Sequence, residues 1–260
     1  MRRVFDVFPF RDELDLLEAR LTELDSAVYR HVLAEAPLTH QGTPKPLHYA
    51  ENRERFAPWK DKIIHVVADL SGCTGHWARD HAMREALWQG LDGLGADDIL
   101  LLCDVDEIPR PEVCQQAPGH VLVLRHHIGA VNLLHPGWWA GPVATLGRPR
   151  GTMQGLRERS RSAMGKILRT PQRTPMGAGW HFSWLGGPDA MRAKVHSFAD
   201  TEQIPFVDAN AERIYADRIH PAEPGTHLLV TEIDHTWPRF MRERRGPAAW
   251  YWPDGATDGT

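Results

Sequence analysis

Three carboxylates stand together directly after a run of apolar residues. Residues 99–103 are apolar throughout, and Asp104, Asp106 and Glu107 follow them closely. In an extended backbone Asp104 and Asp106 point to the same side, because side chains alternate with a period of two. Two like charges so close are stable where a hard divalent cation lies between them and a polyanionic ligand, and ligation by oxygen alone favours Mg²⁺ or Mn²⁺ over zinc. The spacing therefore predicts a metal and phosphate site at Asp104 and Asp106.

The position of these acids in the chain agrees with that chemistry. Ligands of open α/β sheets bind beyond the carboxyl ends of the strands, which is where the three acids fall. The structural alternative is that they cap the N-terminus of a short helix, which Pro109 and Pro111 would begin.

The elements that must position these acids are alternating strands and helices. Apolar runs typical of strands cover 4–8, 27–36, 63–67, 99–103 and 121–124. Helices are expected at 14–24, 76–89, 188–195 and 210–219. The repeated β-α-β order predicts an α/β fold with a Rossmann-like, mostly parallel central sheet flanked by helices.

The composition narrows the class of protein. The chain has 260 residues, with 30 Lys and Arg against 34 Asp and Glu, and a formal net charge of −4. This balance gives no overall basic field, so we expect no nucleic-acid partner. No apolar window is long enough for a membrane span, and the N-terminal residues lack a signal-peptide core. With three cysteines and no Cys-x-x-Cys pair, the sequence predicts a cytoplasmic protein with reduced thiols.

A basic segment interrupts this acidic chain at 148–175. Residues 148–173 contain eight Lys and Arg and one acid, with several Gly and Pro among them. Because Gly and Pro recur along it, the segment is predicted to form a long loop or a short-helix insertion. Two interpretations stay open, a solvated surface excursion and a lid or pad for phosphate or an acidic acceptor.

Several distinctive motifs follow one another along the chain. They are Phe5-Asp6-Val7-Phe8, Glu13-Leu14-Asp15-Leu16-Leu17-Glu18, Thr39-His40-Gln41-Gly42-Thr43-Pro44-Lys45-Pro46-Leu47, Glu51-Asn52, Arg55-Phe56, Asp61-Lys62-Ile63-Ile64-His65, Asp104-Val105-Asp106-Glu107-Ile108-Pro109 and Gly179-Trp180-His181-Phe182-Ser183-Trp184. In this order they resemble the family 17 glycosyltransferases. The resemblance covers about residues 4–115 and 178–202, and it departs from microbial relatives at 197–202, where a histidine is expected.

The resemblance implies a GT-A-type fold and a nucleotide-sugar donor, which is UDP-N-acetylglucosamine in the animal members. It also implies a divalent metal, Mn²⁺ or Mg²⁺, and inversion at the anomeric carbon. By position in the motifs, Asp104 and Asp106 match the residues that bind metal and diphosphate. His181 matches the histidine of a downstream Trp-His motif and is a candidate third metal ligand or catalytic residue.

Transfer of a sugar to a hydroxyl needs a base that takes the hydroxyl proton. Glu107, Asp189 and Glu202 are the candidates, and Glu107 is narrowly preferred. The alternative is that each of these acids is solvated or caps a helix.

Donor recognition is expected at the carboxyl ends of the first strands. Phe8, Glu35 and Asp69 lie at or near three such ends, and each is otherwise an ordinary strand-end residue. Arg84 falls on a helix face with Trp77, His81 and Trp88 and would reach the diphosphate or the acids. Its alternative role is that of an exposed cation beside core tryptophans.

Acceptor recognition is expected in the second part of the chain. Sugars present C–H faces to aromatic rings, so Trp139 and Trp180 are candidate platforms, with Asn132 as a partner for hydroxyls. We expect one domain over 1–260, with a nucleotide-sugar half at about 1–120 and an acceptor half at about 121–260 that carries the basic segment.

The leading interpretation is a metal-dependent inverting glycosyltransferase that moves a sugar to a hydroxyl of a glycan or a small molecule. Two alternatives stay open. One is a non-catalytic module that binds a sugar or a nucleotide. The other is a metal-dependent phosphohydrolase, since aspartates at strand ends also serve as phosphoryl nucleophiles.

Overall fold

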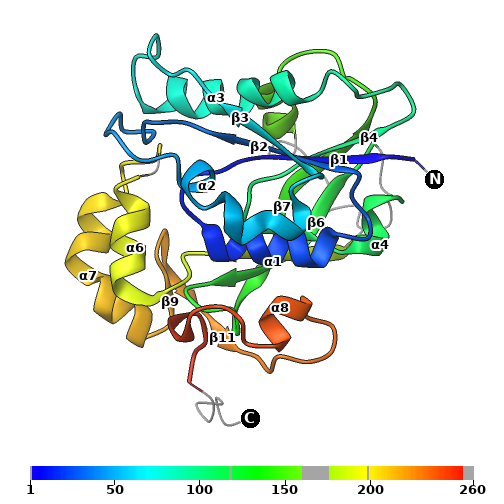
Figure 1. The fold of residues 1–260 in the computed structure, drawn as a ribbon. Coiled ribbons are helices and arrows are strands. Elements are labelled where there is room, and N and C mark those ends of the chain that lie inside the picture. Colours follow the sequence, from blue (N-terminus) through cyan, green and yellow to red (C-terminus); the bar gives the residue numbers. More distant parts are fainter. Residues whose placement is uncertain (1, 117–118, 160–175, 198, 254–260) are drawn as a thin grey trace.

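A large mixed sheet forms the centre of the protein (Figure 1). The computed structural model describes residues 2–116, 119–159, 176–197 and 199–253. The strands lie in the order β3-β2-β1-β4-β7-β6-β8-β5, and β11 pairs with β7. Their bounds are β1 Val4–Pro9, β2 Arg30–Glu35, β3 Ile63–Val67, β4 Ile99–Leu102, β5 Glu107–Pro109, β6 Val121–Ile128, β7 Leu133–Leu146, β8 Met176–Ser183 and β11 Leu229–Val230. A separate two-stranded sheet joins β9 Ile219–His220 to β10 Glu223–His227.

The helices connect and cover these strands. The α-helices are α1 Leu14–Leu24, α2 His48–Glu51, α3 His76–Ala86, α4 Pro111–Cys114, α6 Gly187–Val195, α7 Ile204–Ala216 and α8 Arg239–Arg242. The 3-10 helices are η1 Arg53–Trp59, η2 Leu87–Gly90 and η4 Ala248–Trp250. Residues 153–159 are also helical. In Figure 1, α6 and α7 stand side by side at one end of the sheet.

The first four strands along the chain are parallel to one another, as predicted. Helix α1 connects β1 to β2, and α3 lies between β3 and β4 in the chain. The two helices cover opposite faces, because Val7 and Val32 pack in one core cluster with Met83 of α3 while Phe8 and Leu33 pack in another with α1. The α/β class, with a central sheet flanked by helices, is thereby confirmed.

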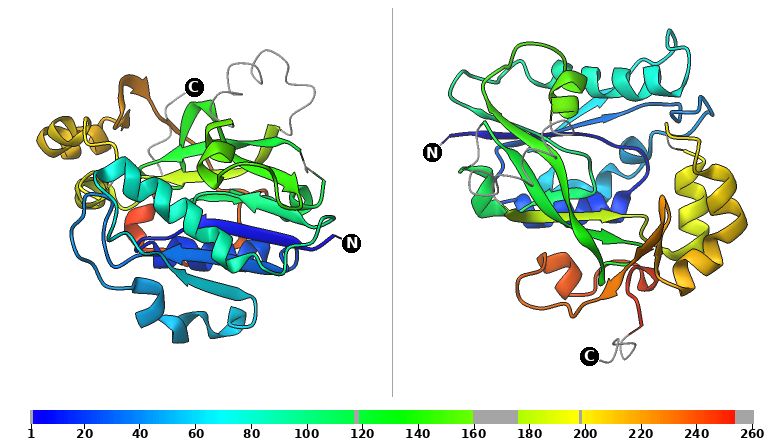
Figure 2. Two further views of the ribbon diagram at one scale, coloured as in Figure 1. Left: turned by 90° about the horizontal axis from the view of Figure 1, so that it is seen from above. Right: turned by 180° about the vertical axis from the view of Figure 1, so that it is seen from behind.

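The later strands make the sheet mixed. Strand β7 is antiparallel to both β4 and β6, and β5 is antiparallel to β8. Only four residues separate β6 from β7, which is enough for an antiparallel turn but too few for a parallel crossover. This long pair runs across the back of the molecule (Figure 2, right). Gly and Pro within 133–146 hid the strand from sequence analysis, because both residues are rare inside strands.

In the described residues, no helix has both the length and the apolar character needed to cross a membrane.

Candidate active site

The acid loop, residues 103–106, lies between β4 and β5. One buried arginine binds its backbone. The guanidinium of Arg20, on α1, donates to the backbone carbonyls of Asp104 at 3.2 Å and Glu107 at 2.5 Å. It also forms a two-pronged pair with the carboxylate of Asp6 on β1. Both side chains of this pair are fully buried. Arg20 therefore fixes the backbone from which the three acids project.

Sequence analysis missed Asp6 and Arg20, although both left a signal. Asp6 is an acid inside an apolar strand, and Arg20 interrupts the apolar stripe of α1. His31 Nδ1 lies 2.8 Å from Asp6 Oδ2 and completes the cluster. Burial raises the pKa of Asp6, but the charge of Arg20 and the hydrogen bonds outweigh it, so this pKa is lowered. A buried charge needs such a partner, and an unexplained charge in an apolar pattern is therefore a clue to one.

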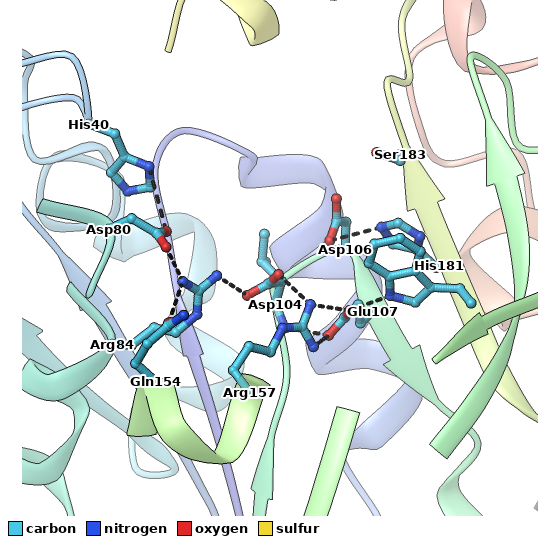
Figure 3. Close-up of polar contacts among 12 residues, drawn as sticks. His40, Asp80, Arg84, Asp104, Asp106, Glu107, Gln154, Arg157, His181 and Ser183 are labelled. Carbon is cyan, nitrogen blue, oxygen red and sulfur yellow. Dashed lines mark hydrogen bonds and ion pairs between the residues drawn. The ribbon is translucent and has the colours of Figure 1, made fainter. Parts of the chain in front are cut away.

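Asp104 is held between two arginines (Figure 3). Arg84 Nη2 lies 3.2 Å from one carboxylate oxygen, and Arg157 Nη2 lies 2.7 Å from the other. Burial raises the pKa of Asp104, yet the two guanidinium groups outweigh burial and lower it to about 2. Asp104 is therefore ionised and neutralised by the chain itself.

Asp106 faces a different set of partners. Lys194 Nζ, on α6, lies 3.1 Å from Asp106 Oδ2, and His181 Nε2 lies 3.6 Å from Oδ1. Burial opposes ionisation, but Lys194 and His181 outweigh it and lower the pKa of Asp106. The His181 ring stacks on both Trp139 and His126, with ring centroids 4.2 and 4.7 Å away, and those two rings also contact each other. This stacking fixes the ring beside Asp106.

Glu107 is sealed from solvent, with a fully buried side chain. Arg157 binds both of its carboxylate oxygens, at 2.9 and 2.5 Å. The indole N–H of Trp139 donates to Oε1 at 2.5 Å, and the backbone N–H of Asp104 donates to Oε2 at 2.7 Å. Each oxygen thus has two donors, and the structure leaves no path by which a substrate hydroxyl would reach it.

Arg157 comes from the basic segment, and its side chain is buried. Met153 and Leu156, on the same helical turn, join the core cluster beneath α3. The described part of this segment therefore enters the protein and is not wholly the surface excursion that sequence analysis considered. The basic residues at 161–173 lie outside the described residues.

A cavity of about 290 Å³ opens at the carboxyl ends of β1 and β4. It brings together the predicted Arg84, Asp104 and Asp106. The other charged or titratable lining side chains come from the loops after β1 and β2, from α3, and from α6 and the residues after it: Arg11, Glu13, His40, Asp80, Lys194 and Asp200. The cavity therefore offers both cations and carboxylates to a polar ligand.

The three predicted metal ligands do not converge in this structure. In the described part of the chain, only His135, His220 and Glu223 bring three metal-binding atoms within 4.8 Å of one another. The Nδ1 atoms of His135 and His220 accept backbone N–H groups, whereas a metal-bound histidine usually donates from its second nitrogen. Neither arrangement fits a divalent ion without rearrangement.

Three predicted donor residues have structural contacts instead. Phe8 is fully buried beneath the guanidinium of Arg20, whose Cζ atom is 4.6 Å from the ring centroid. Glu35 accepts the backbone N–H groups of Tyr49 and Ala50, at the start of α2. Exposed Asp69 accepts the N–H of Ser71. None of these three is among the residues that line the cavity.

The predicted acceptor and base residues also lie apart from this cavity. Asn132 is buried and bonds in both directions to the backbone of Trp252. Trp180 is buried below Arg110, and Trp139 is engaged with Glu107 and His181. Asp189 is fully exposed beside Arg192, and Glu202 is exposed as well. None of them is among the residues that line this cavity, although the backbone N–H of Glu202 donates to the lining residue Asp200.

Comparison with known proteins finds a family model that matches the N-terminal part of the chain and relatives that match more or less of it. Residues 1–126 match the model of glycosyltransferase family 17. The human beta-1,4-mannosyl-glycoprotein 4-beta-N-acetylglucosaminyltransferase is 28% identical over 236 residues, covering 75% of this chain and 43% of its own. The rat protein of the same name is 32% identical over 117 residues, covering 42% of this chain and 22% of its own. The chain thus spans less than half the length of these relatives.

Among solved structures, the apo form of the glycosyltransferase GlyE from Streptococcus pneumoniae TIGR4 covers 92% of this chain and 57% of its own, with 12% sequence identity and a TM-score of 0.30. That likeness is too distant to bear on the site. The predicted relationship is confirmed by the sequence comparisons. Over residues 1–126, this chain is therefore similar to glycosyltransferase family 17.

Proposed function

We propose that this protein transfers N-acetylglucosamine from UDP-N-acetylglucosamine to a hydroxyl, with inversion at the anomeric carbon. Similarity to glycosyltransferase family 17 and to an N-acetylglucosaminyltransferase supports glycosyl transfer. The observation that carries the proposal is the cavity at the ends of β1 and β4, in which Asp104 and Asp106 meet Arg84 and Lys194. Ligands of α/β sheets bind at such strand ends.

The cations of the cavity suit a diphosphate. Arg84 approaches Asp104, and Lys194 approaches Asp106, so both cations already point to the acid loop. Guanidinium and ammonium groups form strong charge-assisted hydrogen bonds to phosphate oxygens. In this proposal Arg84 and Lys194 bind the diphosphate and stabilise the negative charge that grows on it as the glycosidic bond breaks.

The family resemblance predicts Mn²⁺ or Mg²⁺ at Asp104, Asp106 and His181, and this stays a prediction. Because three of the four carboxylate oxygens of Asp104 and Asp106 are paired with Arg or Lys, and the fourth lies beside His181, we assign no step to a metal. A metal requirement is tested directly by running each assay with Mn²⁺, with Mg²⁺ and with a chelator.

The acceptor is proposed to be a glycan hydroxyl. The curated relatives act, by their names, on a beta-1,4-mannosyl-glycoprotein, so β-mannosides are the first acceptors to offer. The two proposed halves, at about 1–120 and 121–260, share one continuous sheet through the pairing of β4 with β7.

The experiment measures release of nucleoside diphosphate from UDP-, GDP- and dTDP-sugars, with and without p-nitrophenyl β-mannoside. We expect UDP release from UDP-N-acetylglucosamine, faster with the acceptor. Binding of UDP without turnover under any condition would favour the sugar- or nucleotide-binding module. Release of inorganic phosphate in place of UDP would favour the phosphohydrolase.

A further inference from the structure

The proposed reaction needs a proton acceptor beside the acceptor hydroxyl. Glu107 is sealed by Arg157 and Trp139. Asp189 points to solvent, and Glu202 is exposed and lines neither of the two cavities discussed here. The base must therefore be sought among the acids that line the cavity.

A second cavity of about 320 Å³ adjoins the first. Arg11, Glu13 and Lys194 line both. The backbone N–H of Phe182, which lines the second cavity, donates to the backbone carbonyl of Asp106 at 2.8 Å. The second cavity therefore lies next to the acid loop and shares a wall with the proposed donor site.

The lining of the second cavity is typical of a sugar site. Trp184 and Trp250, each less than a tenth exposed, supply aromatic edges, and Asp12 and Asp15 supply carboxylates. Sugar rings pack their C–H faces on aromatic rings and direct their hydroxyls to such acids. Trp184 also has φ of +60°, a strained conformation for a bulky side chain and one that clusters at ligand sites.

Glu13 stands where the two cavities meet, and one of its oxygens is fixed. Oε2 accepts the backbone N–H groups of Arg11 and Asp12, both at 3.1 Å. Oε1 lies 3.6 Å from Arg11 Nη2, which is beyond hydrogen-bond length. The side chain is 21% exposed, so Oε1 is left to a ligand. This is the geometry of a positioned base with one anchored and one available oxygen.

The charge state of Glu13 agrees with that role. Burial raises the pKa of Glu13, but Arg11 and Lys194 outweigh burial and lower it. Glu13 is therefore ionised at neutral pH, as a proton acceptor must be. Its motif, Glu13-Leu14-Asp15-Leu16-Leu17-Glu18, is one of those that resemble the family. The proposed binding of the donor diphosphate assigns no role to this motif.

We propose that the second cavity binds the acceptor sugar and that Glu13 is the general base, an inference that rests on the proposed function. The acceptor oxygen attacks the anomeric carbon and forms the new glycosidic bond. The bond from that carbon to the donor phosphate oxygen breaks, and UDP leaves with its electron pair. The hydroxyl proton passes to Glu13 Oε1.

The test compares Glu13→Gln with Glu23→Gln. Glu23 lies on α1, the helix that begins directly after Glu13, and its carboxylate also accepts a backbone N–H, that of Arg239, but it lines neither cavity. The side-chain amide oxygen of glutamine can still accept the two N–H groups that anchor Glu13, so Glu13→Gln should fold. The measurements are transfer to p-nitrophenyl β-mannoside, slow hydrolysis of UDP-N-acetylglucosamine, and calorimetric binding of UDP.

We expect Glu13→Gln to lose transfer and hydrolysis by about 10²-fold or more while its affinity for UDP stays within about twofold. Glu23→Gln should match the wild type in all three. A Glu13→Gln protein that binds UDP and turns over normally would overturn the assignment of the base alone. A wild-type protein that neither binds UDP nor releases it from the donor would overturn the proposed function, and this inference with it.

A second variant tests the cavity itself. Ala193 lines the second cavity and is exposed, so Ala193→Phe should fill that cavity without unfolding the protein. We expect a higher KM for the β-mannoside, with UDP affinity and hydrolysis unchanged. An unchanged KM would place the acceptor elsewhere.

Discussion

Two sets of ion pairs meet at the acid loop, and their side chains differ in how far they are exposed to water. The floor consists of Asp6, Arg20, Glu107 and Arg157, whose side chains are at most 2% exposed. The rim consists of Asp104, Asp106, Arg84 and Lys194, whose side chains are 7 to 28% exposed and line a cavity. Both sets pair carboxylates with cations, so the two sets cannot be distinguished by residue type.

The difference teaches which acids are available to a ligand. In the floor, each carboxylate oxygen accepts hydrogen bonds from the protein itself. Removal of one partner would therefore leave a buried, unpaired charge. At the rim, water or a ligand can replace a partner that moves away. We therefore expect floor substitutions to reduce stability and rim substitutions to reduce ligand binding.

The largest effect is expected for Arg20→Met. It leaves Asp6 without its cation and the carbonyls of Asp104 and Glu107 without their donor. Breaking a buried pair in this way destabilises a protein by about 3–5 kcal/mol. Denaturant unfolding measures the loss, with Arg20→Lys as the charge-conserving variant of intermediate stability. If the free energy of unfolding fell by less than about 1 kcal/mol, Arg20 would not be part of a buried, tightly paired set.

A smaller effect is expected for Glu107→Gln. The amide keeps the size of the side chain but offers Arg157 one neutral oxygen in place of a carboxylate. We expect a loss of about 2–3 kcal/mol in the free energy of unfolding. Arg55→Met, which breaks a partly exposed pair with Asp15 and Glu18, is the control and should change it by at most about 1 kcal/mol. Equal losses in the two variants would contradict the description of Glu107 as sealed.

The contribution of Asp104 should depend on pH. Its pKa is lower in the folded protein, about 2, than its ordinary value of 3.8. The stability that ionised Asp104 supplies is therefore complete above the ordinary value and lost as pH falls through about 2. The difference in unfolding free energy between wild type and Asp104→Asn, about 2 kcal/mol at neutral pH, should vanish over this window. A difference independent of pH would contradict this account.

The smallest effect on stability is expected for Lys194→Met at the rim. Asp106 keeps His181 beside it and can take water from the cavity. We expect the free energy of unfolding to fall by about 1 kcal/mol or less. A loss as large as that of Arg20→Met would erase the distinction between floor and rim.

Local pattern was sufficient to predict the strands that end at the cavity and the acids that follow β4. Asp104, Asp106 and Arg84 were predicted together because strand ends and helix faces are local properties. The pairing of Arg157 with Glu107 joins residues 50 positions apart in the chain, and no local pattern shows it. For the same reason sequence analysis preferred Glu107 as a base, since it does not show the burial that closes access.

The central claim is that the cations of the rim bind the donor diphosphate. Calorimetric titration of UDP into wild type, Lys194→Met and Arg192→Met tests it most directly, because Arg192 lies on the same helix but pairs outside the cavity with Asp189 and Glu212. We predict that Lys194→Met weakens UDP binding by about tenfold or more, whereas Arg192→Met stays within about twofold of wild type. Equal UDP affinities in all three proteins would contradict the claim.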